Sequence, residues 1–298
     1  MAKTISLFER HDVTATNVNL PLIPGVERDC DRYLTTDGAR LRYRDEGRGS
    51  PVLLAHGWTL DLEMWEPQVA ALRDTFRLIR FDRRGFGLSS GRPSVLQDIA
   101  DLGALCDRLA IERIALVGMS QGARAAMGFA MTAPQRVSCL ILDGPPDHGR
   151  NPLPSDDDVP LNHYRGVVRA RGMTAFRREW AAHPLLSLRT GDPRMHEILN
   201  AMIMRYPGND LVEPVAAAEA PRSPLIDPID IPVLVITGDQ DLASRTQAAD
   251  HLAGRLSKAT RAVIPAAGHL PNMDNPNAYN TVMRTFLEQH AVPLTRQE

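Results

Sequence analysis

Short apolar runs alternate with longer amphipathic segments over most of the chain. The apolar runs have the length of β-strands, and several are almost continuously hydrophobic, as expected for strands buried on both faces of a sheet. The predicted strands are Arg32–Thr35, Arg40–Asp45, Val52–Ala55, Phe76–Phe81, Ile114–Val117, Val137–Leu142, Val233–Thr237 and Arg261–Ile264. The predicted helices between them are Trp65–Arg73, Val95–Ala110, Gln121–Ala133, Leu242–Leu256 and Asn277–Gln289. This alternation predicts an α/β fold with a mostly parallel, eight-stranded sheet covered by helices on both faces.

Two stretches depart from the alternation. Residues 1–30 are mixed and rich in turn formers, and we interpret them as an N-terminal extension. Residues 144–223 separate two predicted strands and contain helical pieces with proline-rich turns. We interpret 144–223 as a cap or lid inserted into a core made of residues 31–143 and 224–298.

Composition and charge narrow the class of protein. The 298 residues include 34 basic and 36 acidic side chains, which gives a net charge of −2. So small a charge does not indicate binding to nucleic acid or to an anionic membrane. The longest apolar runs are too short to span a bilayer, and the first ten residues lack the apolar segment of a secretory signal. Three cysteines without CxxC spacing predict reduced thiols rather than disulfides or a zinc site. We therefore expect a cytoplasmic protein with no membrane or nucleic-acid partner and no bound metal.

The strongest chemical signal is the sequence Gly118-Met119-Ser120-Gln121-Gly122, which matches G-x-S-x-G. It follows the strand predicted at Ile114–Val117 and precedes a predicted helix, the context in which this pattern forms a sharp turn that exposes the serine hydroxyl. The helix would also direct its first N–H groups into the same space. Ser120 is therefore the candidate nucleophile.

A serine hydroxyl becomes a good nucleophile only when a neutral imidazole accepts its proton. His269 lies just beyond the last predicted strand, in Ala266-Ala267-Gly268-His269-Leu270, and is the candidate base. Asp241, in Gly238-Asp239-Gln240-Asp241, is the candidate carboxylate that holds the histidine tautomer. The chain order Ser120, Asp241, His269 is the order of the nucleophile-elbow architecture.

The developing oxyanion needs preorganised donors, and two backbone N–H groups are candidates. One belongs to Gln121, directly after the serine, and the other to Trp58 in His56-Gly57-Trp58, after the strand predicted at Val52–Ala55. We expect His56 to be a structural hydrogen-bonding residue rather than a base.

With these motifs the chain resembles the α/β-hydrolase fold superfamily. It is most similar to the small capped type, which includes enol-lactone hydrolases, esterases and cofactor-free haloperoxidases. The resemblance rests on the hairpin signal Asp37-Gly38, the three motifs described above, Gly268-His269 and the run Phe81-Asp82-Arg83-Arg84-Gly85-Phe86-Gly87-Leu88-Ser89. It covers residues 31 to 145 and 225 to 290. Ala123 stands where many relatives have glycine, and residues 1–30 and the cap match nothing recognisable. We expect the Asp82-Arg83-Arg84 cluster to form structural ion pairs.

The resemblance implies a serine hydrolase that needs no cofactor and acts on a small-molecule carboxylic ester or lactone through an acyl-enzyme. Serine at the elbow, where dehalogenases and epoxide hydrolases of this fold use aspartate, argues against those two chemistries. Hydrolysis of a carbon–carbon bond in a ring-cleavage product stays open, as does a slow-turnover receptor for a small ligand.

Two assignments have alternatives. Asp143 also follows a predicted strand, and some enzymes of this fold place the acid there, so it is the alternative to Asp241. In the cap, Trp180 and Phe176 are candidate substrate-pocket residues, although simple packing explains them equally well. The sequence does not indicate the oligomeric state.

Overall fold

The computed structural model describes residues 30–146, 159–212 and 229–292. Its eight strands form one sheet in the order β1-β2-β4-β3-β5-β6-β7-β8. The pairs β1/β2 and β2/β4 are antiparallel and all the others are parallel. The strands are β1 Arg32–Thr36, β2 Ala39–Gly47, β3 Ser50–Ala55, β4 Phe76–Phe81, β5 Ile114–Met119, β6 Val137–Asp143, β7 Val233–Gly238 and β8 Ala259–Ile264. The predicted sheet is thus confirmed.

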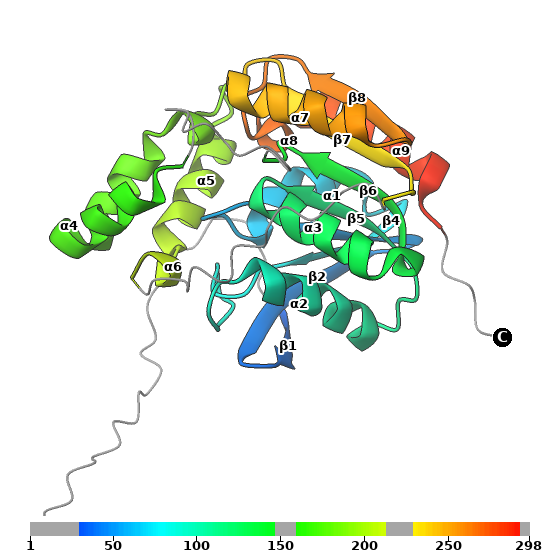
Figure 1. Ribbon diagram of the computed structural model, residues 1–298, viewed down its shortest axis with the longest axis horizontal. Helices are drawn as coiled ribbons and strands as arrows, with labels where there is room; N and C mark the ends of the chain where they lie inside the picture. Colours follow the sequence, from blue (N-terminus) through cyan, green and yellow to red (C-terminus); the bar gives the residue numbers. More distant parts are fainter. Residues whose placement is uncertain (1–29, 147–158, 213–228, 293–298) are drawn as a thin grey trace, which may run out of the picture.

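The helices cover both faces of this sheet (Figure 1). They are α1 Glu66–Leu72, α2 Val95–Arg108, α3 Gln121–Thr132, α4 Leu161–Ala181, α5 Pro193–Arg205, α6 Asn209–Val212, α7 Ala243–Arg255, α8 Pro271–Asp274 and α9 Pro276–His290. Short 3-10 helices are η1 Leu62–Trp65, η2 Pro134–Arg136 and η3 Pro184–Leu186. The five predicted core helices are present, with ends that differ from the prediction by at most two residues. The short helix α8, next to the candidate histidine, was not predicted.

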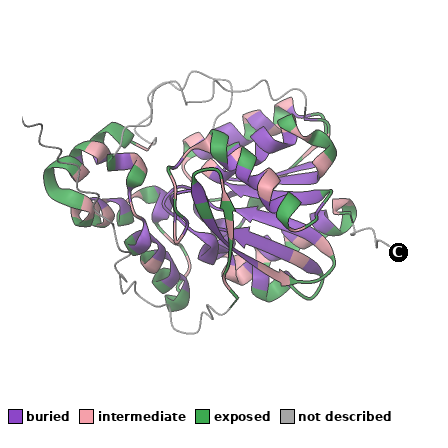
Figure 2. Ribbon diagram, turned by 90° about the horizontal axis from the view of Figure 1, so that it is seen from below, coloured by how far each residue is buried: buried purple, intermediate pink, exposed green. Residues whose placement is uncertain are grey.

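The core has two apolar layers because successive strand side chains point to opposite faces. On β3, Val52 and Leu54 pack with residues of α1 and α9, whereas Leu53 and Ala55 pack with residues of α2, α3 and α7. Figure 2 shows the strands buried between helices whose outer surfaces are exposed. The edge strand β8 is an exception to the expected two-sided burial, since Val263 is 53% exposed.

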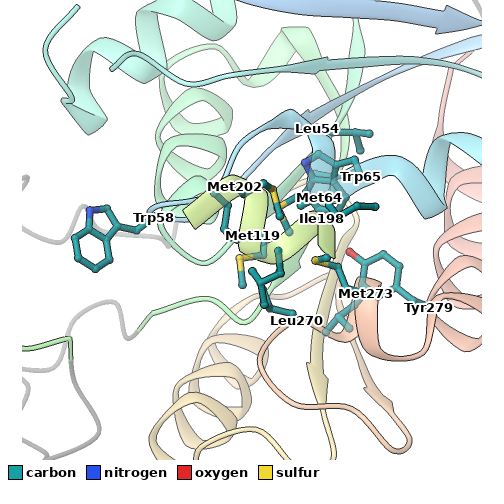
Figure 3. Close-up of a cluster of buried hydrophobic side chains, with 14 of the residues drawn as sticks. Leu54, Trp58, Met64, Trp65, Met119, Ile198, Met202, Leu270, Met273 and Tyr279 are labelled. Atoms are coloured by element: carbon teal, nitrogen blue, oxygen red, sulfur yellow. The ribbon is translucent and has the colours of Figure 1, made fainter. Parts of the chain in front are cut away.

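The three helices α4 to α6, called here the cap helices, lie together on one side of the core (Figure 1). On α5, Ile198 and Met202 pack beside Met64 and Met119 of the core (Figure 3). Arg205 at the end of α5 forms buried ion pairs with Asp61, at 2.7 Å, and with Glu63, at 2.5 Å. Apolar packing and buried charge therefore both hold the cap helices against the core.

The cap helices also share an aromatic cluster with the core. Trp58 makes edge contacts with Phe176, Trp180 and Tyr206, with ring centroids 4.9 to 6.0 Å apart. The indole N–H of Trp180 donates to Oγ1 of Thr59 at 2.7 Å. This cluster places α4 next to the loop that follows β3.

Part of the expected domain division lies outside the described residues. That is the case for residues 1–29 of the expected extension, for 147–158 and 213–223 of the expected cap, and for 224–228 and 293–298 of the expected core. None of the described helices combines the length and the apolar character needed to cross a membrane.

Candidate active site

Ser120 lies in a strained turn between β5 and α3. Its φ of +50° and ψ of −113° fall in a region that non-glycine residues rarely occupy, as expected for a nucleophile elbow. Small neighbours make the turn possible. A Cβ on Gly118 would lie 2.6 Å from the carbonyl oxygen of Gly122, and a Cβ on Gly122 would lie 2.4 Å from that of Ala55. The two glycines of the motif therefore allow α3 to approach both β5 and β3.

His269 and Asp241 come together from neighbouring parallel strands. Asp241 follows β7, His269 follows β8, and these strands pair in register from Val233–Ala259 to Gly238–Ile264. The Nδ1 of His269 lies 3.0 Å from Oδ2 of Asp241, and both side chains are almost completely buried. The other oxygen of Asp241 accepts a hydrogen bond from the N–H of Leu242 at 2.7 Å. This pairing leaves Nε2 of His269 as the ring nitrogen available for proton transfer.

The loop that carries His269 is fixed by two other carboxylates. Asp274 on α8 accepts from the N–H of Gly268 at 2.7 Å and from that of Arg189 at 2.5 Å. Asp239 accepts from the N–H of Ala267 at 3.1 Å. Asp274 was missed by the sequence analysis because it belongs to the unpredicted helix α8.

Asp143, the alternative acid, occupies a different environment. Its carboxyl group is fully buried at the end of β6, beside Tyr279 and Asp241. Burial and the negative charge of Asp241 raise the pKa of Asp143 well above its ordinary value, so its neutral form is favoured. The carboxylate that lies at hydrogen-bonding distance from His269 is that of Asp241, at 3.0 Å.

Gly144 is a second residue that the sequence analysis missed. Its φ is +51°, and a Cβ at this position would lie 2.7 Å from Cε1 and 3.0 Å from Nδ1 of His269. The imidazole therefore packs directly on the backbone that follows β6. The signal in the sequence was a glycine immediately after a strand end.

The chain segments that carry the two candidate oxyanion donors both adjoin Ser120. Strands β3 and β5 are parallel neighbours, with Ala55 opposite Gly118. A Cβ on Gly57 would lie 3.5 Å from Cβ of Ser120, so the loop after β3, in which Trp58 is the next residue, lies against Ser120. Gln121 is the first residue of α3, so its N–H has no acceptor within the helix.

Side chains behind these loops form a buried polar frame. Arg83 donates to Oδ2 of Asp98 at 2.6 Å and to Oε1 of Gln121 at 2.9 Å. His56 is fully buried, and its Nε2 accepts from the N–H of Arg83 at 2.8 Å. Burial, reinforced by the charge of Arg83, lowers the pKa of His56 to about 3. The expected structural role of His56 agrees with this environment.

The Asp82-Arg83-Arg84 cluster forms the expected structural ion pairs. Besides the Arg83–Asp98 pair, Arg84 binds Asp101 at 2.8 Å and Asp82 faces Arg42 at 3.3 Å. All six side chains are buried. Within residues 30–146, 159–212 and 229–292, no three His, Cys, Asp or Glu side chains lie close enough together to hold a metal ion.

Two adjoining pockets open on Ser120. The smaller one, of about 30 Å³, is lined by Ser120 and His269 together with Trp58 and Trp180. The larger one, of about 270 Å³, is lined by Ser120, Trp58 and Gln121 and by the charged side chains of Arg124, Asp210 and Arg245. Phe176 lines neither pocket: it is completely buried in the aromatic cluster, 6.0 Å from Trp58 between ring centroids. Of the two candidate pocket residues, Trp180 lines a pocket together with Ser120, and Phe176 does not.

Comparisons with known proteins agree with this architecture. The family model of the alpha/beta hydrolase fold matches residues 50–276. Bacillus subtilis has a relative named as a 2-succinyl-6-hydroxy-2,4-cyclohexadiene-1-carboxylate synthase, which is 27% identical over 85% of this chain and 96% of its own. The 3-oxoadipate enol-lactonase 2 of Acinetobacter baylyi is 26% identical over 86% of this chain and 96% of its own.

Among solved structures, a thermophilic esterase from Thermogutta terrifontis with malate bound superposes with a TM-score of 0.74. It is 29% identical and covers 88% of this chain and 99% of its own. The family model spans well over half of the chain, and the relatives are similar over nearly their whole lengths. The chain therefore belongs to the α/β-hydrolase fold family and is an α/β-hydrolase enzyme.

Proposed function

We propose that the protein is a serine hydrolase that cleaves a small carboxylic ester or lactone through an acyl-enzyme. The observation that carries the proposal is the convergence of three groups in one place. Ser120 sits in a strained elbow, and His269 lines the same pocket. His269 is in turn oriented by a buried hydrogen bond to Asp241.

Each group has a defined role in this mechanism. Oγ of Ser120 attacks the carbonyl carbon while Nε2 of His269 accepts the hydroxyl proton. The N–H groups of Trp58 and Gln121 donate to the oxyanion, and Asp241 stabilises the imidazolium. When the tetrahedral intermediate collapses, Nε2 returns the proton to the leaving alkoxide. Water then attacks the acyl-enzyme with His269 again as base, which releases the carboxylic acid and restores Ser120.

Residues behind the catalytic groups support their geometry. The side chain of Gln121 accepts from Arg83, so the first turn of α3 is held from behind by a buried arginine. The imidazole of His269 is held between Asp241 and the backbone of Gly144. Such preorganisation is what stabilisation of an oxyanion requires, because the donors need not reorient during the reaction.

Both the relatives and the site favour a small ester or lactone as the substrate. An enol-lactonase and an esterase are among the proteins to which the chain is similar over most of its length. Another relative is named as a synthase, so one protein similar to this chain carries a different reaction in its name. The pockets total a few hundred Å³, which suits a small substrate rather than a long acyl chain.

The experiment is to follow hydrolysis of p-nitrophenyl acetate and p-nitrophenyl butyrate over many turnovers, with Ser120→Ala as the matched variant. We expect sustained product release by the parent protein and no release above background by Ser120→Ala, whose melting temperature should stay close to that of the parent. An alkyl fluorophosphonate should label only the parent. A single stoichiometric burst would favour a slow-turnover receptor, and hydrolysis by Ser120→Ala would overturn the mechanism.

A further inference from the structure

Two of the cap helices bind neighbouring residues of the loop that follows β3. On α6, Oδ2 of Asp210 accepts from the indole N–H of Trp58 at 2.7 Å. The other oxygen of this carboxylate accepts from the hydroxyl of Tyr206, so Asp210 is itself held in place. The next loop residue, Thr59, accepts at Oγ1 from the indole N–H of Trp180 on α4, also at 2.7 Å. Side chains of α4 and α6 thus hold two successive residues of this loop.

The third cap helix, α5, binds the same loop two residues further on. Nε and one terminal nitrogen of Arg205 donate to Oδ2 of Asp61 at 3.1 and 2.7 Å. The other oxygen of Asp61 accepts from the N–H of Glu63 at 2.9 Å, which fixes the end of the loop at η1. Each of the three cap helices, which lie side by side in Figure 1, therefore sends one side chain to this loop.

Thr59 adopts a strained backbone conformation between these contacts. Its φ is +65°, in the left-handed region that a β-branched residue rarely occupies. Such conformations persist only where the surrounding structure holds them, and they cluster at functional sites. Thr59 is almost completely buried, and its side chain is bound by Trp180 from the cap. Contacts from the cap helices therefore help to keep this residue in an unfavourable conformation.

The strained loop also lies against the nucleophile. A Cβ on Gly57 would lie 3.5 Å from Cβ of Ser120, and Trp58, the next residue, carries a candidate oxyanion donor on its backbone. A displacement of about 1 Å in an active site can cost about 10²-fold in rate, so the position of this N–H group matters. It depends on the conformation of Thr59 on one side and on the position of the Trp58 ring on the other. Both are bound from the cap helices.

We propose, resting on the serine-hydrolase function above, that Thr59 and Asp210 are positioning residues through which the cap helices hold the N–H of Trp58 in place for the oxyanion. Neither residue has to touch the reacting atoms for this role. Thr59 lines neither of the two pockets described above. The cap helices then contribute to the chemical step itself, in addition to forming part of the pocket wall.

The test of Thr59 compares two conservative variants. Thr59→Val keeps the shape and the β-branched backbone restriction but removes the acceptor for Trp180, whereas Thr59→Ser keeps the hydroxyl group. On p-nitrophenyl acetate, Thr59→Val should lower kcat and kcat/KM equally, by about ten- to a hundredfold, because the lost interaction is made only in the transition state. Thr59→Ser should stay close to the parent. All values are corrected for the folded fraction by circular dichroism.

Asp210 is tested through its partner. Asp210→Ala and Trp58→Phe each remove one side of the hydrogen bond, and Trp58→Phe keeps the backbone N–H. Each should lower kcat, and the double variant should lose no more than the weaker single variant, because the two residues act through one contact. Glu197→Gln is the matched control, since Glu197 is an exposed acidic residue on α5. It should keep the parental kcat.

A tetrahedral adduct gives a second readout that loss of stability alone would not change. Oγ of Ser120 adds to the carbonyl carbon of 1,1,1-trifluorobutan-2-one while its proton passes to Nε2 of His269, which leaves a negative charge on the former carbonyl oxygen. This oxygen needs the same donors as the transition state. The inhibition constant should therefore rise in Thr59→Val and Asp210→Ala in parallel with the loss of kcat, and stay unchanged in Glu197→Gln.

The outcomes separate this proposal from the one it rests on. Parental kcat in both Thr59→Val and Asp210→Ala, with only a lower melting temperature, would overturn the positioning role and leave the serine hydrolase intact. The same holds if kcat falls while the inhibition constant does not change, or if the losses of Asp210→Ala and Trp58→Phe add in full. Absence of any Ser120-dependent hydrolysis by the parent protein would overturn the proposed function itself.

Discussion

Nδ1 of His269 lies 3.0 Å from Oδ2 of Asp241, although the two residues are 28 positions apart and follow different strands. Asp143, by contrast, is buried next to Asp241 with its pKa raised by burial and by the charge of that neighbour. The two carboxyl groups therefore have different environments in the same small region. The carboxylate of Asp241 lies at hydrogen-bonding distance from the imidazole, whereas burial and the charge of Asp241 disfavour the ionised form of Asp143.

The first prediction follows from that difference. Asp241→Asn should lower kcat on the order of 10⁴-fold, because an amide favours the wrong imidazole tautomer and carries no charge. Asp143→Asn should change kcat only modestly, because it replaces a carboxyl group whose neutral form is already favoured. The measurement is kcat for both variants on one ester, corrected for the folded fraction by circular dichroism. A larger loss from Asp143→Asn would reverse the assignment of the acid.

The second prediction concerns the pH dependence of stability. A histidine takes up a proton near pH 6.5 in the unfolded chain, whereas the pKa of buried His56 is about 3. Between these values the unfolded state binds one proton more than the folded state at this site. The free energy of unfolding should therefore fall as the pH is lowered from about 6.5, by up to about 1.4 kcal/mol per pH unit from this residue.

Replacing His56 isolates its contribution. His56→Gln should be less stable than the parent at pH 7, because the acceptor for the N–H of Arg83 is altered. Its free energy of unfolding should nevertheless decline less steeply between pH 6.5 and 4.5. Urea titrations of both proteins across that range measure the two slopes. Equal slopes would mean that His56 does not contribute to acid sensitivity.

The third prediction addresses how the cap helices are held. Arg205→Met should destabilise the protein by about 3–5 kcal/mol, because it leaves the buried carboxylates of Asp61 and Glu63 without their partner from α5. Arg194→Met is the matched control, since Arg194 lies on the same helix and is exposed. Denaturant unfolding gives both values. The interpretation fails if the two variants lose equal amounts of stability.

The fourth prediction separates two aromatic residues of α4. Trp180 lines the pocket that contains Ser120 and His269, so Trp180→Ala should change the relative kcat/KM for acetate, butyrate and octanoate esters. Phe176 is completely buried in the aromatic cluster, so Phe176→Ala should mainly lower stability, by about 3–5 kcal/mol. Chain-length profiles and melting curves of both variants are needed. An unchanged profile in Trp180→Ala would show that Trp180 serves packing alone.

The sequence by itself determined the class of fold and the position of the sharp turn at Ser120. Alternating strand and helix patterns require a parallel sheet covered on both faces, and the structure has that sheet. The elbow could be recognised because its geometry depends on residues only two positions from Ser120, where a side chain would collide with the neighbouring backbone. Local sequence is sufficient for features whose contacts are local.

Only the tertiary structure decided which distant side chains meet. Asp143 and Asp241 both follow strands, and pairing with His269 was settled by where the β7 and β8 loops emerge. In the same way, the contact of Arg205 with Asp61 joins positions 144 residues apart. The pocket wall shared by Arg124 and Arg245 was equally hidden, because neither residue belongs to a motif. The physical reason is that such contacts depend on strand order and on the packing of helices against the sheet, which the spacing of residues along the chain does not specify.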